Sequence, residues 1–139
     1  TVVCADTDRA CVAYNTDQTI ERIELSDGLH VFSNSFEFGA PSEKVDRVYQ
    51  LFLKLSEDYD RQFSAGAFLN AAAKALGDHA LSDNLHDLRD AICVHGDISG
   101  TVSSSIIFFS DAERQFQMHY CAGAPCQKPF SLSATLNVR

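Results

Sequence analysis

Apolar and polar residues alternate along the first third of the chain, which is the pattern of half-buried β-strands. Segments 1–5 and 10–15 flank the turn sequence DTDR and predict a hairpin. Two further alternating runs, 19–25 and 29–32, are separated by Asp27-Gly28, a dipeptide typical of tight turns. We therefore expect four strands before the first helix.

The hydrophobic period then changes to that of amphipathic helices between residues 42 and 76. The first helix is expected to begin after Ser42, whose hydroxyl can cap free N–H groups, and to end near residue 57 or 58. Ser64 can cap a second helix, and Gly77 suits the position just after its end. The apolar stripes comprise Val45, Val48, Tyr49, Phe52 and Leu55 in the first helix, and Ala65, Phe68, Leu69, Ala72, Ala73 and Leu76 in the second.

Strand patterns return after a polar segment over residues 77–90, which we expect to be a loop with a short helical turn. Apolar or alternating runs over 91–95, 101–110, 115–121 and 130–138 predict three or four more strands. Strands and helices that are grouped in this way predict an α+β fold, with antiparallel sheets and two adjacent helices.

The length and charge of the chain narrow the classes of partner. With 139 residues, the chain is expected to be a single domain. Nineteen acidic residues against eleven basic ones give a net charge of −8, which argues against nucleic-acid backbones and anionic membranes as partners. No fully apolar run is longer than the five residues ACVAY, so no membrane span is predicted.

Five cysteines at irregular spacing predict reduced thiols and a cytoplasmic protein. Cys4, Cys11 and Cys93 lie in apolar runs and are expected to fill the core. Cys121 and Cys126 lack a second cysteine pair, and the chain has no HxxxH sequence, so we expect no metal site and no cofactor. Of the histidines, His79 and His86 are expected to be solvated, and His30 and His119 to lie on polar strand faces.

Thr1 is a candidate nucleophile because it precedes a predicted strand. In N-terminal nucleophile hydrolases, a Thr, Ser or Cys that begins a strand attacks the substrate, and its own α-amine is the general base. The alternative is that Thr1 only marks the point where the chain was cut. No GxSxG or phosphate-binding glycine loop is present to indicate another class of enzyme.

Three segments together resemble one family. LHVFSNSFEFGAPSEKV is similar to a signature in which a strand ends in SN and leads through Pro and Lys into a helix. RDAICVHGDISGTVSSSIIFF is similar to a second signature of the form GTRxSTxxL, and TVVCADTDRACVAYNTDQ resembles the strand pair before the first. The chain thus resembles the NRDE family, which includes the transport and Golgi organisation protein 2 group, over residues 1 to about 116.

The resemblance implies an αββα fold of the N-terminal nucleophile hydrolase type and hydrolysis of an amide or a thioester. It implies that Asn34 stabilises an oxyanion, and that Ser33, Ser35, Thr101 and Ser104 lie around the substrate. The NRDE string and the leading Cys of the family are not in this chain, and Val102 stands where the family has Arg. The chain is therefore expected to correspond to the C-terminal part of the family, with the nucleophile outside it.

Two alternatives remain open beside this reading. The Golgi-organisation group is associated with trafficking and with handling of haem or lipid, which implies a binding protein without turnover. His30, His95 and His119 are the candidate haem ligands. Half of a sandwich would also leave apolar sheet surface uncovered. We expect a homodimer, a missing N-terminal segment or the chain's own helices to cover it.

Overall fold

The structure is a computed structural model that describes residues 1–15, 19–33, 42–59, 64–80 and 91–138. The described chain divides into two compact units, Thr1–Pro41 and Ser42–Arg139, called here the first and the second unit. No helix among the described residues is long and apolar enough to cross a membrane. The single domain predicted from chain length stays a prediction.

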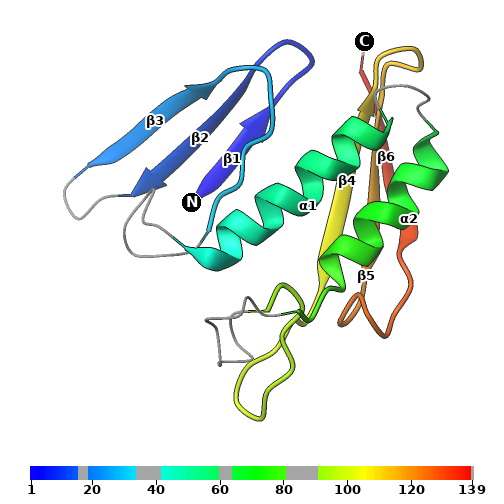
Figure 1. The fold of residues 1–139 in the computed structure, drawn as a ribbon. Helices are drawn as coiled ribbons and strands as arrows, with labels where there is room; N and C mark the ends of the chain where they lie inside the picture. Colours follow the sequence, from blue (N-terminus) through cyan, green and yellow to red (C-terminus); the bar gives the residue numbers. More distant parts are fainter. Residues whose placement is uncertain (16–18, 34–41, 60–63, 81–90, 139) are drawn as a thin grey trace. The chain divides into compact units, whose positions relative to one another are not determined.

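The first unit is a three-stranded antiparallel sheet in the order β1-β2-β3 (Figure 1). The predicted hairpin is confirmed, with Cys4 opposite Cys11 in the register. Its turn is held by the Asp6 carboxylate, which accepts the backbone N–H groups of residues 8 and 9 at 2.8 Å, and these bonds lower the pKa of Asp6. The strands are β1 (Val2–Ala5), β2 (Ala10–Asn15) and β3 (Ile20–Leu25).

The predicted fourth strand at residues 29–32 is wrong, because this segment belongs to no strand. His30 donates from Nε2 to the Ser26 carbonyl oxygen at 2.8 Å and stacks on Phe32, with ring centroids 6.3 Å apart. Alternation along the sequence is a local property, whereas a strand requires a neighbouring strand as a hydrogen-bonding partner. Here the side chain of His30 instead fastens the segment to the preceding turn.

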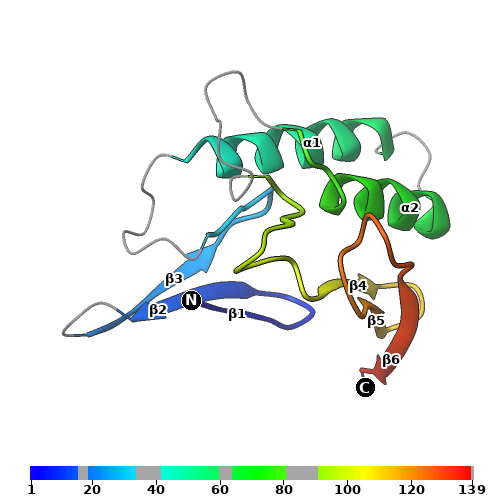
Figure 2. The same cartoon turned by 90° about the horizontal axis from the view of Figure 1, so that it is seen from below.

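The second unit places two helices side by side on one face of an antiparallel sheet of order β4-β5-β6 (Figures 1 and 2). Together with the first unit, this arrangement confirms the α+β class, with two helices and two three-stranded antiparallel sheets. The elements are α1 (Glu43–Tyr59), α2 (Ala65–Leu76), β4 (Ser104–Ser110), β5 (Gln115–Cys121) and β6 (Ser131–Asn137).

The core of the second unit lies where both helices meet β4. Leu55 of α1, Ala72 of α2 and Ile106 of β4 are buried and in contact. The small Ala72 side chain is only 1% exposed, so it allows α2 to approach its neighbours closely. The partly buried side chains around these three are Phe52, Phe68, Leu69, Ala71, Leu76, Phe108 and Phe130.

The helix boundaries agree with the sequence pattern, but only some of the predicted capping interactions are present. Ser42 Oγ accepts the N–H of Val45 at 3.4 Å, as expected of a cap. Ser64 makes no side-chain cap bond, so its predicted capping role is wrong. Gly77 follows α2 with φ −88°, which is not the left-handed conformation expected of it. A Cβ at Gly77 would lie 3.2 Å from the backbone N of Cys126, so close approach of that segment explains the glycine.

The segment 91–95 was predicted as a strand and is not one. It forms only an isolated antiparallel bridge between His95 and Gly100, and β4 begins at Ser104. The apolar side chains at its start are nevertheless buried, since Ala91 is 2% and Cys93 is 1% exposed. The segment is a loop whose first residues are buried, and it carries Cys93 and His95 of the candidate site.

A candidate metal centre

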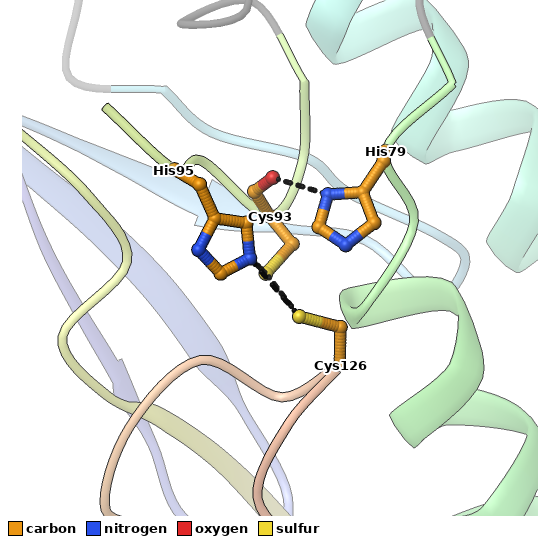
Figure 3. Close-up of side chains that lie close together, drawn as sticks. All are labelled: His79, Cys93, His95 and Cys126. Carbon is orange, nitrogen blue, oxygen red and sulfur yellow. Dashed lines mark hydrogen bonds between the residues drawn. The ribbon is translucent and has the colours of Figure 1, made fainter. Parts of the chain in front are cut away.

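Four side chains from three separate segments point toward one another in the second unit (Figure 3). His79 lies three residues after the end of α2, and Cys93 and His95 flank Val94 in the loop before β4. Cys126 lies in the connection between β5 and β6. One potential ligand atom from each residue lies within 4.8 Å of the other three, so the four side chains could hold one metal ion.

The distances between these atoms resemble the edges of a zinc tetrahedron. A zinc ion with Zn–S of about 2.3 Å and Zn–N of about 2.0–2.1 Å sets sulfurs about 3.8 Å apart and sulfur about 3.6 Å from nitrogen. The Sγ atoms of Cys93 and Cys126 are 3.6 Å apart, and Cys93 Sγ is 3.7 Å from His95 Nε2. The 3.0 Å between His95 Nε2 and Cys126 Sγ is clearly shorter than a tetrahedral edge, and it is a hydrogen-bond distance.

The orientation of His79 supports ligation through its other nitrogen. Its Nδ1 lies 2.9 Å from the carbonyl oxygen of Cys93 and donates to it, so in a neutral ring Nε2 is the nitrogen that can bind a metal (Figure 3). Metal-binding imidazoles are commonly fixed in this way by a hydrogen bond from the second ring nitrogen to a carbonyl. The ring of His79 also lies beside that of His95, with centroids 5.0 Å apart.

The loop that carries Cys93 and His95 is closed by its own backbone. Val94 N–H donates to Thr101 Oγ1 at 3.0 Å, and Thr101 N–H donates to the Val94 carbonyl at 2.9 Å. A Cβ at Gly96 would lie 2.9 Å from the Ser99 carbonyl, which explains a glycine within this tight loop. Cys93 and His95, on either side of Val94, are thus held in place by hydrogen bonds within their own loop.

The segment after α2 is fastened to the same loop and to α1. Cys93 N–H donates to the carbonyl of Asp78 at 3.0 Å, next to His79. The Asp78 carboxylate accepts two bonds from Arg47 of α1, from Nε at 2.6 Å and from Nη2 at 2.5 Å. Both partners are partly exposed, at 23% and 31%, so we expect this ion pair to position the segment more than to stabilise the fold.

Cys126 is presented by a connection that is folded on itself. The buried Cys121 thiol contacts the carbonyl oxygens of Gly123 and Lys128 at 3.4 and 3.3 Å, which closes the connection. Gly123 has φ 149°, and a Cβ there would lie 2.9 Å from the Lys128 side chain. This position therefore requires glycine, and the connection brings Cys126 against Gly77 at the end of α2.

The surroundings of Cys126 favour its neutral thiol over the thiolate. Desolvation, followed by the hydrogen bond from Cys93, raises the pKa of Cys126 above its usual value. Without a metal, the folded state therefore favours the neutral thiol, and this contribution to stability is lost as the pH rises through the raised pKa. A bound divalent cation would reverse the preference, because thiolate is the form that binds metal.

The structure corrects several expectations for cysteine and histidine. Cys4 is exposed and fills no core, and Cys11 is half-buried. His79 is exposed, as expected, and its ring also contacts Cys93 and His95. The polar-face expectation for His119 is also wrong. Its Nε2 is buried and has no hydrogen-bond partner among the described residues, and the ring packs edge-on against Phe108, with ring centroids 5.4 Å apart.

The site residues predicted from the sequence fall in different parts of the structure. Asn34 and Ser35 lie outside the described residues, as does His86. Thr1 and Ser33 are exposed in the first unit. In the second unit, the Thr101 hydroxyl accepts from Val94, and Ser104 begins β4 opposite Cys121. The hydrolase, the haem or lipid carrier and the homodimer therefore stay predictions. The sequence reasoning did not group His79, Cys93, His95 and Cys126, the four residues of the candidate centre.

Comparison with known proteins adds no assignment. No family model, no curated protein and no solved structure matches this chain. The resemblance to the NRDE family therefore stays a prediction, as does the αββα arrangement that it implies. The function must be argued from the chemistry of the described residues.

Proposed function

We propose that the protein binds one zinc ion through His79, Cys93, His95 and Cys126. The observation that carries the proposal is the convergence of four potential ligand atoms, one from each residue, within 4.8 Å of one another. A hydrogen bond can explain why one cysteine lies beside one histidine. It does not explain why two thiols and two imidazoles converge on the same point. A single tetrahedral ion uses all four.

The set of donors selects zinc among the common metals. Two sulfur and two nitrogen donors in tetrahedral geometry are typical of zinc, whereas magnesium and calcium require oxygen ligands. Two thiolates neutralise the charge of a divalent ion, so the bound centre would add no net charge to the partly buried site. The carbonyl of Cys93 supports the imidazole of His79 from outside the ligand set.

The function of the ion would be structural. Four protein ligands complete the coordination of zinc and leave no position for water or substrate, which is the difference between structural and catalytic zinc sites. The ligands join the end of α2, the loop before β4 and the β5–β6 connection. These segments lie outside the Leu55–Ala72–Ile106 core, so the ion would fix loops that the core does not reach.

A zinc titration of the metal-free protein, followed by competition with a chromophoric chelator, tests this proposal. We expect the wild-type chain to bind one equivalent. Cys126→Ser should bind more than about 100-fold more weakly, because loss of a ligand costs more than the loss of a supporting partner. Cys4→Ser is the matched control, since this exposed thiol lies in the first unit, and it should bind as the wild type does.

Two results would contradict the zinc proposal. The first is a wild-type chain that takes up no zinc at concentrations that saturate ordinary structural sites. The second is equal weakening of binding by Cys126→Ser and Cys4→Ser, which would show that zinc is held elsewhere or by scattered thiols.

A further inference from the structure

The two thiols of the candidate centre are close enough to react with each other. The Sγ atoms of Cys93 and Cys126 are 3.6 Å apart, and both cysteines are free. A disulfide requires an S–S distance of about 2.05 Å, so the two sulfur atoms need to approach by about 1.5 Å. Rotation of two short side chains, one of them in an exposed connection, can supply such a movement.

The exposure of the two residues differs and sets an order of reaction. Cys126 is exposed, whereas Cys93 is 1% exposed. A reagent in solution therefore meets Cys126 first, and Cys93 can react only with a sulfur that is already beside it. This combination of one accessible and one resolving thiol is typical of cysteine pairs that are oxidised reversibly.

The three remaining cysteines do not compete for this reaction. Cys121 is fully buried, and its thiol is engaged with the carbonyls of Gly123 and Lys128. Cys4 and Cys11 are opposite each other in the sheet of the first unit, so they form a separate pair that an experiment must keep apart.

We propose that Cys93 and Cys126 form a dithiol that small-molecule disulfides oxidise to an intramolecular disulfide, and that this oxidation and zinc binding exclude each other. The mutual exclusion rests on the proposed function, because it takes both sulfurs as zinc ligands. The oxidation to a disulfide rests only on the geometry of the two thiols.

The reaction with glutathione disulfide balances in two exchanges. The Cys126 thiolate attacks the reagent, forms a mixed disulfide and releases one glutathione thiolate. The Cys93 thiolate then attacks the Cys126 sulfur, closes the protein disulfide and releases the second glutathione thiolate. The two protein sulfurs are oxidised and two glutathione sulfurs are reduced, and the two thiol protons pass to the released thiolates. Zinc must leave, since only His79 and His95 remain as ligands.

The test is peptide mapping by mass spectrometry after treating the protein with glutathione disulfide, once after removal of metal with EDTA and once with zinc. The metal-free chain should yield a Cys93–Cys126 linked peptide. With free zinc at about 100 times its Kd, only about 1% of the sites are free, so the linkage should form about 100-fold more slowly. Cys4→Ser should form the same linkage, which separates it from the pair in the first unit.

Two variants resolve the order of the exchanges. Cys93→Ser should accumulate glutathione on Cys126, because the resolving thiol is absent. Cys126→Ser should leave Cys93 reduced, because a buried thiol does not meet the reagent. The wild-type map remains decisive even if a variant fails to fold.

The possible failures are distinguishable. A wild-type chain that binds zinc but carries only a persistent glutathione adduct on Cys126 would overturn the dithiol while leaving the zinc proposal intact. A linked peptide from a chain that does not bind zinc would overturn the zinc proposal and support the dithiol. A linkage that forms equally fast with bound zinc would overturn the mutual exclusion.

Discussion

Zinc at about a thousand times its Kd will raise the free energy of unfolding by about 4 kcal/mol. The size follows from mass action, since a ligand that binds only the folded state stabilises it in proportion to the logarithm of its concentration over Kd. The unfolded chain cannot hold His79, Cys93 and Cys126 together, because the contacts that join them span 14 and 33 residues. Urea unfolding with and without zinc measures the effect, expected as a midpoint shift of about 2 M for a slope of about 2 kcal/mol per M.

The control for this prediction is a variant that loses one proposed zinc ligand but keeps its stability in the absence of metal. Cys126→Ser replaces an exposed side chain, so its metal-free stability should stay close to that of the wild type. It should gain little or nothing from zinc. If zinc stabilises the wild type and Cys126→Ser by the same amount, the ion acts at another place, and the structural role assigned to the centre is contradicted.

Leu55→Ala will lower the free energy of unfolding by about 3 kcal/mol. Leu55 is 6% exposed and packs against Ala72 and Ile106, so its loss removes buried apolar surface and leaves a cavity. Such substitutions cost about 2–5 kcal/mol, and the small neighbour Ala72 cannot fill the space. Urea unfolding of the metal-free protein measures the cost without a contribution from zinc.

Leu136→Ala provides the matched substitution at an exposed site. Leu136 in β6 is 65% exposed, so the same chemical change should cost less than about 1 kcal/mol. Equal costs at the two positions would contradict the assignment of the core to the junction of α1, α2 and β4. A larger cost at Leu136 would indicate that β6 has a packing partner beyond the contacts described here.

Hydrophobic periodicity predicted the helices well because their stripes are long and the signal is repeated. The expected start after Ser42 and end near residue 57 or 58 lie within two residues of α1. The same reasoning placed strands at residues 29–32 and 91–95, where the structure has none. Four or five residues of suitable pattern are compatible with a strand, but a strand also needs a partner, which short-range patterns do not contain.

The candidate centre could not be predicted by ligand spacing. The search for two cysteine pairs or an HxxxH sequence assumes that ligands come in local pairs. Here the one local pair is Cys93-Val94-His95, a spacing that carries little information by itself. His79 and Cys126 join it only because the end of α2 and the β5–β6 connection meet at that loop. In the sequence, Gly77 after the second helix and Cys126 in the segment AGAPCQKP are ordinary loop features, and neither indicates a metal by itself.

The most direct measurement is the zinc K-edge X-ray absorption spectrum of the protein loaded with one equivalent of zinc. We expect a four-coordinate ion with two sulfur neighbours at about 2.3 Å and two nitrogen neighbours at about 2.0–2.1 Å. Cys126→Ser should lose one sulfur from this shell, and Cys4→Ser should leave it unchanged. A six-coordinate shell of oxygen and nitrogen without sulfur would contradict a zinc centre at His79, Cys93, His95 and Cys126.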